Sequence, residues 1–294
     1  MAMDRSGFNA TDESGRRNSR CHICPLDGAR GPARFAGFAC LALLAACSTD
    51  APAGPGPETP TAPPFSGTIF IDPDIITAAD PTTFEGLIYA GQALRLMFDR
   101  RVNDWITVDA YLFDATFDDG LEAEVQVNAE FGSEDAALVQ ALKYAEVIGR
   151  LPTALRLDVE TVWIHRGTEP FGGGNNNLLI HIGQAALYEA DGILEETFVH
   201  EAAHTSLDGL HADSPGWLAA QAADPVFIST YARDFPSRED IAESFLPWLA
   251  VRHRRGRIDQ TLADRILLAI PNRLQYFDAQ AFKLYPIVQS SGSN

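Results

Sequence analysis

The chain has 294 residues, of which 46% are hydrophobic and 21% are charged, values typical of a folded globular protein. Its 22 basic residues face 40 acidic ones, which gives a net charge of −18 at pH 7. Nucleic-acid binding needs clusters of lysine and arginine to neutralise phosphates, and no such cluster stands out. We therefore expect no nucleic-acid partner.

The first 65 residues carry the signs of an export and tether sequence. Arg30 and Arg34 precede an apolar run over residues 35–46. A helix needs about 20 apolar residues to span a bilayer, so this shorter run indicates the hydrophobic part of a secretory signal. The stretch over residues 44–47, Leu-Ala-Ala-Cys, resembles a bacterial lipobox, in which the cysteine is lipidated and becomes the first mature residue.

We accordingly expect a leader and signal peptide over residues 1–46, a proline-rich disordered tether over 47–65 and a folded domain over 66–294. Proline-rich stretches behave as semi-rigid spacers. A lipid on Cys47 would anchor the protein to a membrane of the bacterial cell envelope, in the periplasm or at the outer membrane. Cleavage before Cys47 also leaves no second cysteine, so the mature chain would contain no internal disulfide.

Residues 66–294 contain no low-complexity linker, which favours one continuous domain. The first part, residues 66–131, is predicted to be a strand-rich N-terminal subdomain because β-branched and aromatic residues recur in it. We interpret the charged run Asp99-Arg100-Arg101 as structural ion pairing. The expected strands cover residues 68–71, 93–98, 105–113 and 122–128.

The following segments alternate between helix and strand patterns. Ser133 is a good N-cap for a helix that ends at Gly149, with apolar residues repeating on one face. A strand over residues 155–164, a glycine-rich loop over 171–177 and a strand over 178–182 come next. This order predicts a mixed α+β fold with a small sheet.

A metal-binding pattern lies after this region, in His200-Glu201-Ala202-Ala203-His204. Asp191 is a candidate N-cap and Gly209 a candidate terminator for a helix that contains it. On such a helix the two imidazoles lie about 40° apart around the axis and roughly 6 Å apart along it, so both can reach one ion. Glu201 then projects beside them, where it can take a proton from a metal-polarised water.

A catalytic zinc site uses three protein ligands, so one more is needed. The metzincin spacing fails, because positions 207 and 210 hold leucines. His211 is one residue out of that register and remains an alternative third ligand. Asp208 continues the stripe of the two histidines, but we expect it to serve packing or a turn.

A second predicted helix offers a better ligand. Ser237 is its candidate N-cap, with Asp240 at the capping-box position, and Pro247 is expected to bend it or restart it. Glu239 and Glu243 are four residues apart and therefore lie on one face.

With this glutamate pair, residues 135–250 resemble the gluzincin branch of zinc metallopeptidases, in particular the catalytic domain of the anthrax lethal factor type. The resemblance implies a zincin-like fold, Zn²⁺ as the cofactor and Glu239 as the third ligand. It also implies that Glu243 hydrogen-bonds the zinc-bound His200, and that Tyr231 faces the zinc.

The expected function is zinc-dependent hydrolysis of a peptide or protein substrate. In that mechanism Glu201 is the general base, and Tyr231 donates a hydrogen bond to the developing oxyanion. Residues 178–182 are expected to form the edge strand that pairs with an extended peptide. Two alternatives remain open, a non-enzymatic surface lipoprotein with a structural metal and a hydrolase that acts on another type of bond.

The remaining histidines are given structural roles. His165 and His181 lie in predicted strands and are expected to belong to the core. His253 lies among arginines and is expected on a solvated basic face.

Overall fold

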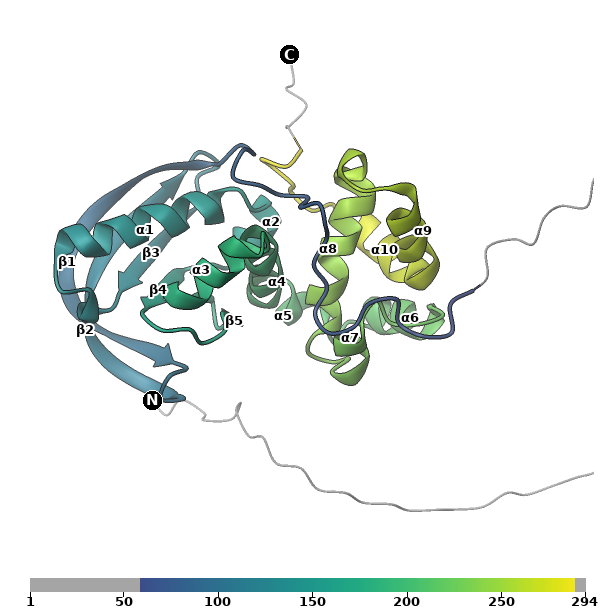
Figure 1. Cartoon of the computed structure of the whole chain (residues 1–294), viewed down its shortest axis with the longest axis horizontal. Helices are drawn as coiled ribbons and strands as arrows, with labels where there is room; N and C mark the ends of the chain where they lie inside the picture. The colour runs from purple at the N-terminus through teal and green to yellow at the C-terminus, as the bar shows by residue number, and fades with distance from the viewer. Residues whose placement is uncertain (1–58, 289–294) are drawn as a thin grey trace, which may run out of the picture. The chain divides into compact units, whose positions relative to one another are not determined.

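The computed structural model describes residues 59–288 of the chain (Figure 1). The predicted signal peptide, Cys47 and the first part of the predicted tether lie outside the described residues. None of the helices in the described range is both long enough and apolar enough to cross a membrane.

A six-stranded mixed sheet forms one side of the domain, with the strand order β1-β2-β3-β4-β6-β5. The first three strands are antiparallel, β3, β4 and β6 run parallel, and the short β5 is antiparallel to β6 at the edge. The strands are β1 (Phe84–Asp99), β2 (Asp104–Phe117), β3 (Glu122–Val127), β4 (Thr161–His165), β5 (Gly172–Gly174) and β6 (Asn177–His181).

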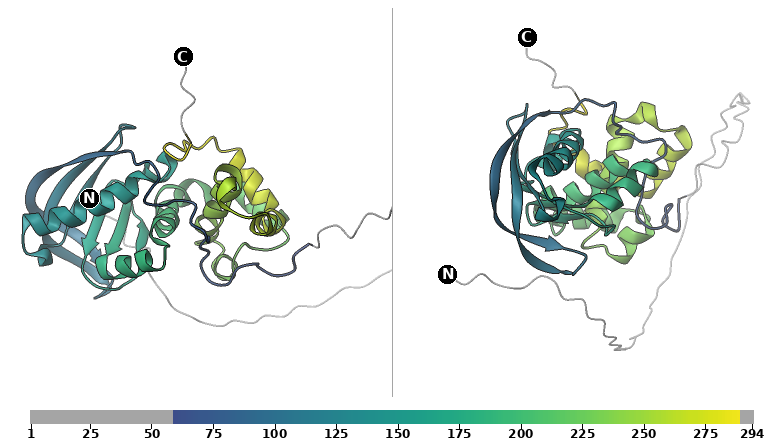
Figure 2. Two further views of the ribbon diagram at one scale, coloured as in Figure 1. Left: turned by 45° about the horizontal axis from the view of Figure 1, so that its top comes forward. Right: turned by 60° about the vertical axis from the view of Figure 1, so that its left-hand side comes forward.

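In chain order, helices lie both between the strands and after them. Helices α6 to α10 lie together on the side of α4 that faces away from the sheet (Figure 2). The parallel pair β3 and β4 is connected through α1 and α2, as parallel strands require a crossover. The helices are α1 (Glu134–Gly149), α2 (Thr153–Arg156), α3 (Ile182–Ala190), α4 (Leu194–Ser206), α5 (Asp208–His211), α6 (Pro215–Ala223), α7 (Thr230–Asp234), α8 (Asp240–His253), α9 (Gln260–Ala269) and α10 (Pro271–Asp278), with short 3-10 turns at Ala129–Phe131 and Arg255–Arg257.

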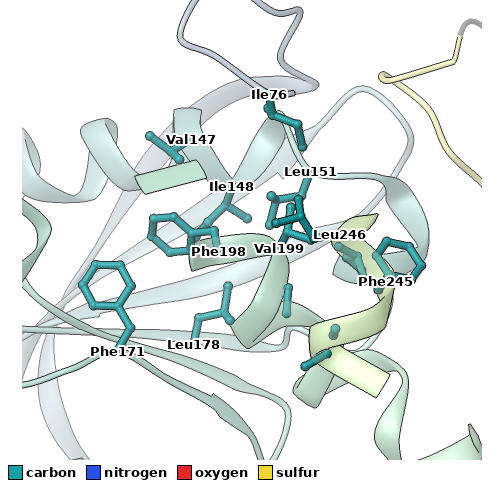
Figure 3. Close-up of a cluster of buried hydrophobic side chains, with 14 of the residues drawn as sticks. Ile76, Val147, Ile148, Leu151, Phe171, Leu178, Phe198, Val199, Phe245 and Leu246 are labelled. Carbon is teal, nitrogen blue, oxygen red and sulfur yellow. The ribbon is translucent and has the colours of Figure 1, made fainter. Parts of the chain in front are cut away.

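Helix α4 lies in the main hydrophobic core, between α1 and the sheet on one side and α8 on the other (Figure 3). Phe198 and Val199 are completely buried there, close to Ile148 of α1 and Leu246 of α8. Burying a side chain of this size stabilises the fold by about 1.5–3 kcal/mol. The packing therefore fixes the rotation of α4 and with it the direction of the polar residues on its remaining face.

The expected α+β class is confirmed, and several predicted elements are close to the observed ones. Ser133 accepts a hydrogen bond from the Ala136 amide at the start of α1, which ends at Gly149 as predicted. The strands predicted over residues 93–98 and 105–113 fall within β1 and β2, and the one predicted over 122–128 covers β3 and extends one residue beyond it.

Other predicted elements are wrong. Residues 68–71 form no strand, because the amides of Ile69 and Ile71 donate instead to the carboxylates of Glu243 and Glu196. The predicted strand over residues 155–164 is split, with α2 at its start and β4 at its end.

The start and end of the helix that carries His200 and His204 also differ from prediction. Asp191 ends α3 instead of capping the next helix. Gly192 then adopts a φ of +72°, a left-handed conformation that suits glycine and turns the chain into α4. At the other end α4 stops at Ser206, and Gly209 lies inside α5.

Candidate metal centre

The two histidines of the motif point their outer ring nitrogens at each other. His200 and His204 lie one turn apart on α4, with their Nε2 atoms 3.2 Å apart. Both side chains are partly accessible, at 13% exposure each. The helical context expected for the motif is therefore present, although α4 is shorter than predicted.

Glu239 joins the two histidines from the N-cap position of α8. Its Oε2 atom lies 3.1 Å from Nε2 of His204 and 3.4 Å from Nε2 of His200. The Glu239 amide donates to the carbonyl of Phe235, which fixes the turn between α7 and α8. This packing brings together one ligand atom from each of the three residues, and His211 is not part of the group.

The spacing of these three atoms fits a small divalent ion. Tetrahedral ligands at about 2.0–2.1 Å from zinc lie about 3.3 Å from each other. The observed separations are 3.2, 3.1 and 3.4 Å. Two imidazole nitrogens and one carboxylate oxygen are also a donor set that catalytic zinc sites use.

Each of these two histidines has a carboxylate near its Nδ1 atom. Nδ1 of His204 lies 2.7 Å from Oδ2 of Asp208, and Nδ1 of His200 lies 3.4 Å from Oε1 of Glu243. A carboxylate that accepts a hydrogen bond from Nδ1–H keeps the proton on that nitrogen. The lone pair of Nε2 is then free for a metal ion. Asp208 therefore has a role that sequence analysis missed, although its place four residues after His204 was the available signal.

Glu243 is held in place by contacts on its other oxygen. Oε2 accepts hydrogen bonds from the Ser229 hydroxyl at 2.5 Å and from the Ile69 amide at 3.2 Å. The side chain is completely buried, and burial raises its pKa to about 7. Oε1 of Glu243 lies near Nδ1 of His200 at 3.4 Å but makes no hydrogen bond within the described residues, so the hydrogen bond that the lethal factor resemblance implied stays a prediction.

The second carboxylate oxygen of Glu239, Oε1, also accepts hydrogen bonds. Oε1 accepts hydrogen bonds from the Tyr231 hydroxyl at 3.0 Å and from Nε of Arg238 at 2.7 Å. Burial and the nearby Glu239 raise the pKa of Tyr231, which keeps its hydroxyl protonated. Tyr231 thus lies beside the candidate ligand, and Arg238 is a second neighbour that sequence analysis did not identify.

The cluster stabilises positive charge. Burial alone would lower the pKa of His204, but contacts with Asp208 and Glu239 outweigh it and raise that pKa to about 10. Burial alone would raise the pKa of Glu239, yet its contacts with His200 and His204 hold that pKa far below its usual range. A bound cation would be stabilised by the same carboxylates.

Glu201 lies on the helix between the two histidines, under the edge strand β5. The backbone of Gly173 packs so closely on α4 that an added Cβ would lie 1.8 Å from the carbonyl oxygen of Glu201. The neighbouring Gly174 amide donates to the Thr205 hydroxyl. The predicted edge strand over residues 178–182 is wrong, because β6 lies between β4 and β5 and the glycine strand forms the edge.

Three other histidines of the described range do not belong to the cluster. Nδ1 of His211 pairs with the Tyr276 hydroxyl at 2.7 Å. His165 and His181 are fully buried and stacked on each other, as expected for core residues, and burial lowers the pKa of His165 to about 4. Asp99 pairs with Arg101 at 2.7 Å, which agrees with the predicted structural ion pair.

Comparison of the chain with protein-family models, with curated proteins and with solved structures found no match. What the fold and the site define is therefore a class: a mixed α+β protein with a His200-His204-Glu239 cluster suited to a metal ion. The two histidines come from one helix, and the glutamate comes from the start of a later one.

Proposed function

We propose that this protein is a zinc metallopeptidase with a zincin-like catalytic domain. The observation that carries the proposal is the convergence of His200, His204 and Glu239 on one point, with Glu201 on the same helix beneath an edge strand. Three protein ligands leave one position for water, which distinguishes a catalytic zinc site from a structural one closed by four residues.

His200, His204 and Glu239 would hold the ion, while Asp208 and Glu243 keep the imidazoles in the metal-binding tautomer. Bound zinc lowers the pKa of water towards 7 and polarises a carbonyl group.

The chain's own groups supply the remaining chemistry. The Glu201 carboxylate, which accepts no hydrogen bond from the described residues, takes the proton of the attacking water and transfers it to the leaving amine. Tyr231, a neutral phenol, would turn its single donor proton from Oε1 of Glu239, where it lies in this structure, to the developing oxyanion. The unpaired side of β5 offers backbone groups to an extended peptide, which would bind by strand addition.

The lipobox resemblance supports a location for this activity. We propose that the protein is exported and anchored to a membrane of the bacterial cell envelope through a lipid on Cys47. Its substrate would then be a peptide or protein of that compartment. Metabolic labelling with a fatty acid tests the anchor, because label should be incorporated into the wild type and be lost in Cys47→Ala.

Metal analysis combined with cleavage of a peptide library tests the activity. The purified full chain should bind about one zinc ion and cleave peptides. Glu201→Gln should keep the metal but lose hydrolysis, and Glu239→Ala should lose both. His211→Gln is the matched control, since it changes a nearby histidine outside the cluster and should leave both readouts unchanged.

Four outcomes would overturn the proposal. A wild type without bound metal, or a Glu239→Ala variant with undiminished metal, would exclude the assigned site. Metal binding without hydrolysis would favour the surface lipoprotein with a structural metal. Hydrolysis of esters alone would favour a non-peptide hydrolase.

A further inference from the structure

Two arginines lie next to parts of the candidate site, in a chain whose net charge is −18. Arg238 precedes the candidate ligand Glu239, and Arg100 lies in the β1–β2 turn against the edge strand. An added Cβ on Gly172 of β5 would lie 2.8 Å from a terminal nitrogen of Arg100. Both arginines therefore lie near the groups that would hold and cut a peptide.

Arg238 is oriented but remains open to solvent. Its Nε donates to Oε1 of Glu239, and its guanidinium lies 5.0 Å above the ring of Phe235. These two contacts fix the plane of the guanidinium, while its side chain remains 63% exposed. A preoriented guanidinium loses little conformational entropy when it binds a further group.

The carboxylates of the site do not offer a comparable surface to a substrate. Exposure is 5% for the side chain of Glu239 and 0% for that of Glu243, while Asp208 pairs with His204 at 2.7 Å. Arg238 is thus the most exposed charged side chain among the residues that contact the metal cluster. This positive charge is therefore accessible to a ligand that binds at the site.

Arg100 is available for a second contact. Its neighbour Arg101 forms ion pairs with two carboxylates, those of Asp99 and Glu130. Within residues 59–288, no carboxylate forms an ion pair with Arg100, although acidic residues outnumber basic ones in the chain. Its position beside Gly172 places a free cation at one end of β5.

We propose that the site selects peptides that carry a carboxylate group, with Arg238 as the specificity-determining residue and Arg100 as a second contact beside β5. Arginine and carboxylate form paired, charge-assisted hydrogen bonds, which few other side chains can match. The carboxylate could belong to an Asp or Glu side chain or to the peptide's C-terminus. The inference rests on the proposed peptidase activity and concerns the substrate of the same site.

A binding measurement tests the inference without turnover. The full-length, zinc-loaded Glu201→Gln chain is titrated with fluorescent alanine-based hexapeptides that carry Glu, Gln or Lys at each position in turn. Each peptide is made with an amidated and with a free C-terminus. We expect at least one Glu peptide, or the free acid, to bind about tenfold more tightly than its Gln or amidated counterpart. The advantage should shrink with salt, since the guanidinium is exposed.

Variants then show which arginine causes the preference for a carboxylate. Arg238→Gln should remove most of it, Arg238→Lys should retain part, and Arg100→Gln should reduce it at a different peptide position. The matched control is Arg233→Gln, which removes a half-exposed arginine of α7 that pairs with Asp234. Bound zinc is measured in every variant, because Arg238 also contacts Glu239.

The outcomes separate this inference from the proposed function. Equal binding of Glu and Gln peptides, or a preference unchanged in Arg238→Gln, overturns the role of Arg238 even if peptides are cleaved. A preference that disappears in Arg238→Gln while zinc stays bound supports it. In the wild type, absence of cleavage despite such selective binding would contradict the peptidase activity and leave the carboxylate subsite intact.

Discussion

Nδ1 of His204 and Oδ2 of Asp208 lie 2.7 Å apart, one helical turn from each other, across the break between α4 and α5. The contact orients the ring of His204, whose Nε2 faces Glu239 at 3.1 Å. Because α4 ends at Ser206, Asp208 approaches the imidazole from the first turn of the next helix. Asp208 therefore contacts His204 from outside α4.

We predict that Asp208→Ala weakens zinc binding about 10- to 100-fold, because the carboxylate that orients His204 is lost. Asp208→Asn keeps an acceptor oxygen and should lose less. A competition titration with a zinc chelator measures both, and Asp213→Asn on the exposed turn after α5 serves as the control. An affinity unchanged in Asp208→Ala would show that the contact does not support the metal.

Glu243→Ala should lower the free energy of unfolding as well as the metal affinity. The substitution leaves the buried Ser229 hydroxyl and the Ile69 amide without their acceptor. Each unsatisfied buried group costs about 1–3 kcal/mol, so we expect a loss of about 2–5 kcal/mol in urea unfolding of the metal-free chain. Ser229→Ala removes one of the two donors and should lose less. A Glu243→Ala variant as stable as the wild type would contradict this account.

Gly173→Ala should displace β5 from α4, because its Cβ would lie 1.8 Å from the Glu201 carbonyl oxygen. Such overpacking costs about 1–3 kcal/mol, and it should reduce peptide hydrolysis while zinc remains bound. Thermal unfolding, zinc content and cleavage rate are measured together. The control is Gly209→Ala, where the added methyl group meets no atom within 4 Å. An unchanged cleavage rate in Gly173→Ala would show that the position of β5 on α4 does not affect hydrolysis.

Glu196 should make stability depend on pH. Burial raises its pKa to about 7, although the amides of Ile71 and Ile75 donate to its carboxylate. The folded state therefore keeps a proton that the unfolded state releases near its ordinary pKa of 4.5. This contribution is fully present below about pH 4.5 and is lost as pH rises through about 7, by about 3 kcal/mol in total.

Urea unfolding at pH 5 and pH 8 measures the effect of Glu196. The difference in unfolding free energy between the two pH values should shrink by about 2 kcal/mol in Glu196→Gln. Glu134→Gln, at the exposed start of α1, is the control. The same pH dependence in Glu196→Gln and wild type would mean that Glu196 is ionised in the folded protein.

Local patterns were sufficient for part of the fold and site. A Ser133 N-cap and a repeating apolar face predict α1 almost to the residue, because capping and helix periodicity act over a few neighbouring positions. In the same way the four-residue spacing of His200 and His204 predicts their convergence. The pairing of Glu239 with these histidines was implied by resemblance, and only the packing of α8 on α4 shows the contact.

The sequence by itself determined the helix face that carries His200, Glu201 and His204, because that geometry is set by the helical repeat. Tertiary structure decided which distant groups meet this face: Glu239 and the edge strand that contains Gly173. It also decided that the segment around Ile69 satisfies its amides on buried carboxylates rather than in the sheet. Such contacts join positions far apart in the chain. Their free energy depends on how whole helices and strands pack, rather than on residues that are neighbours in sequence.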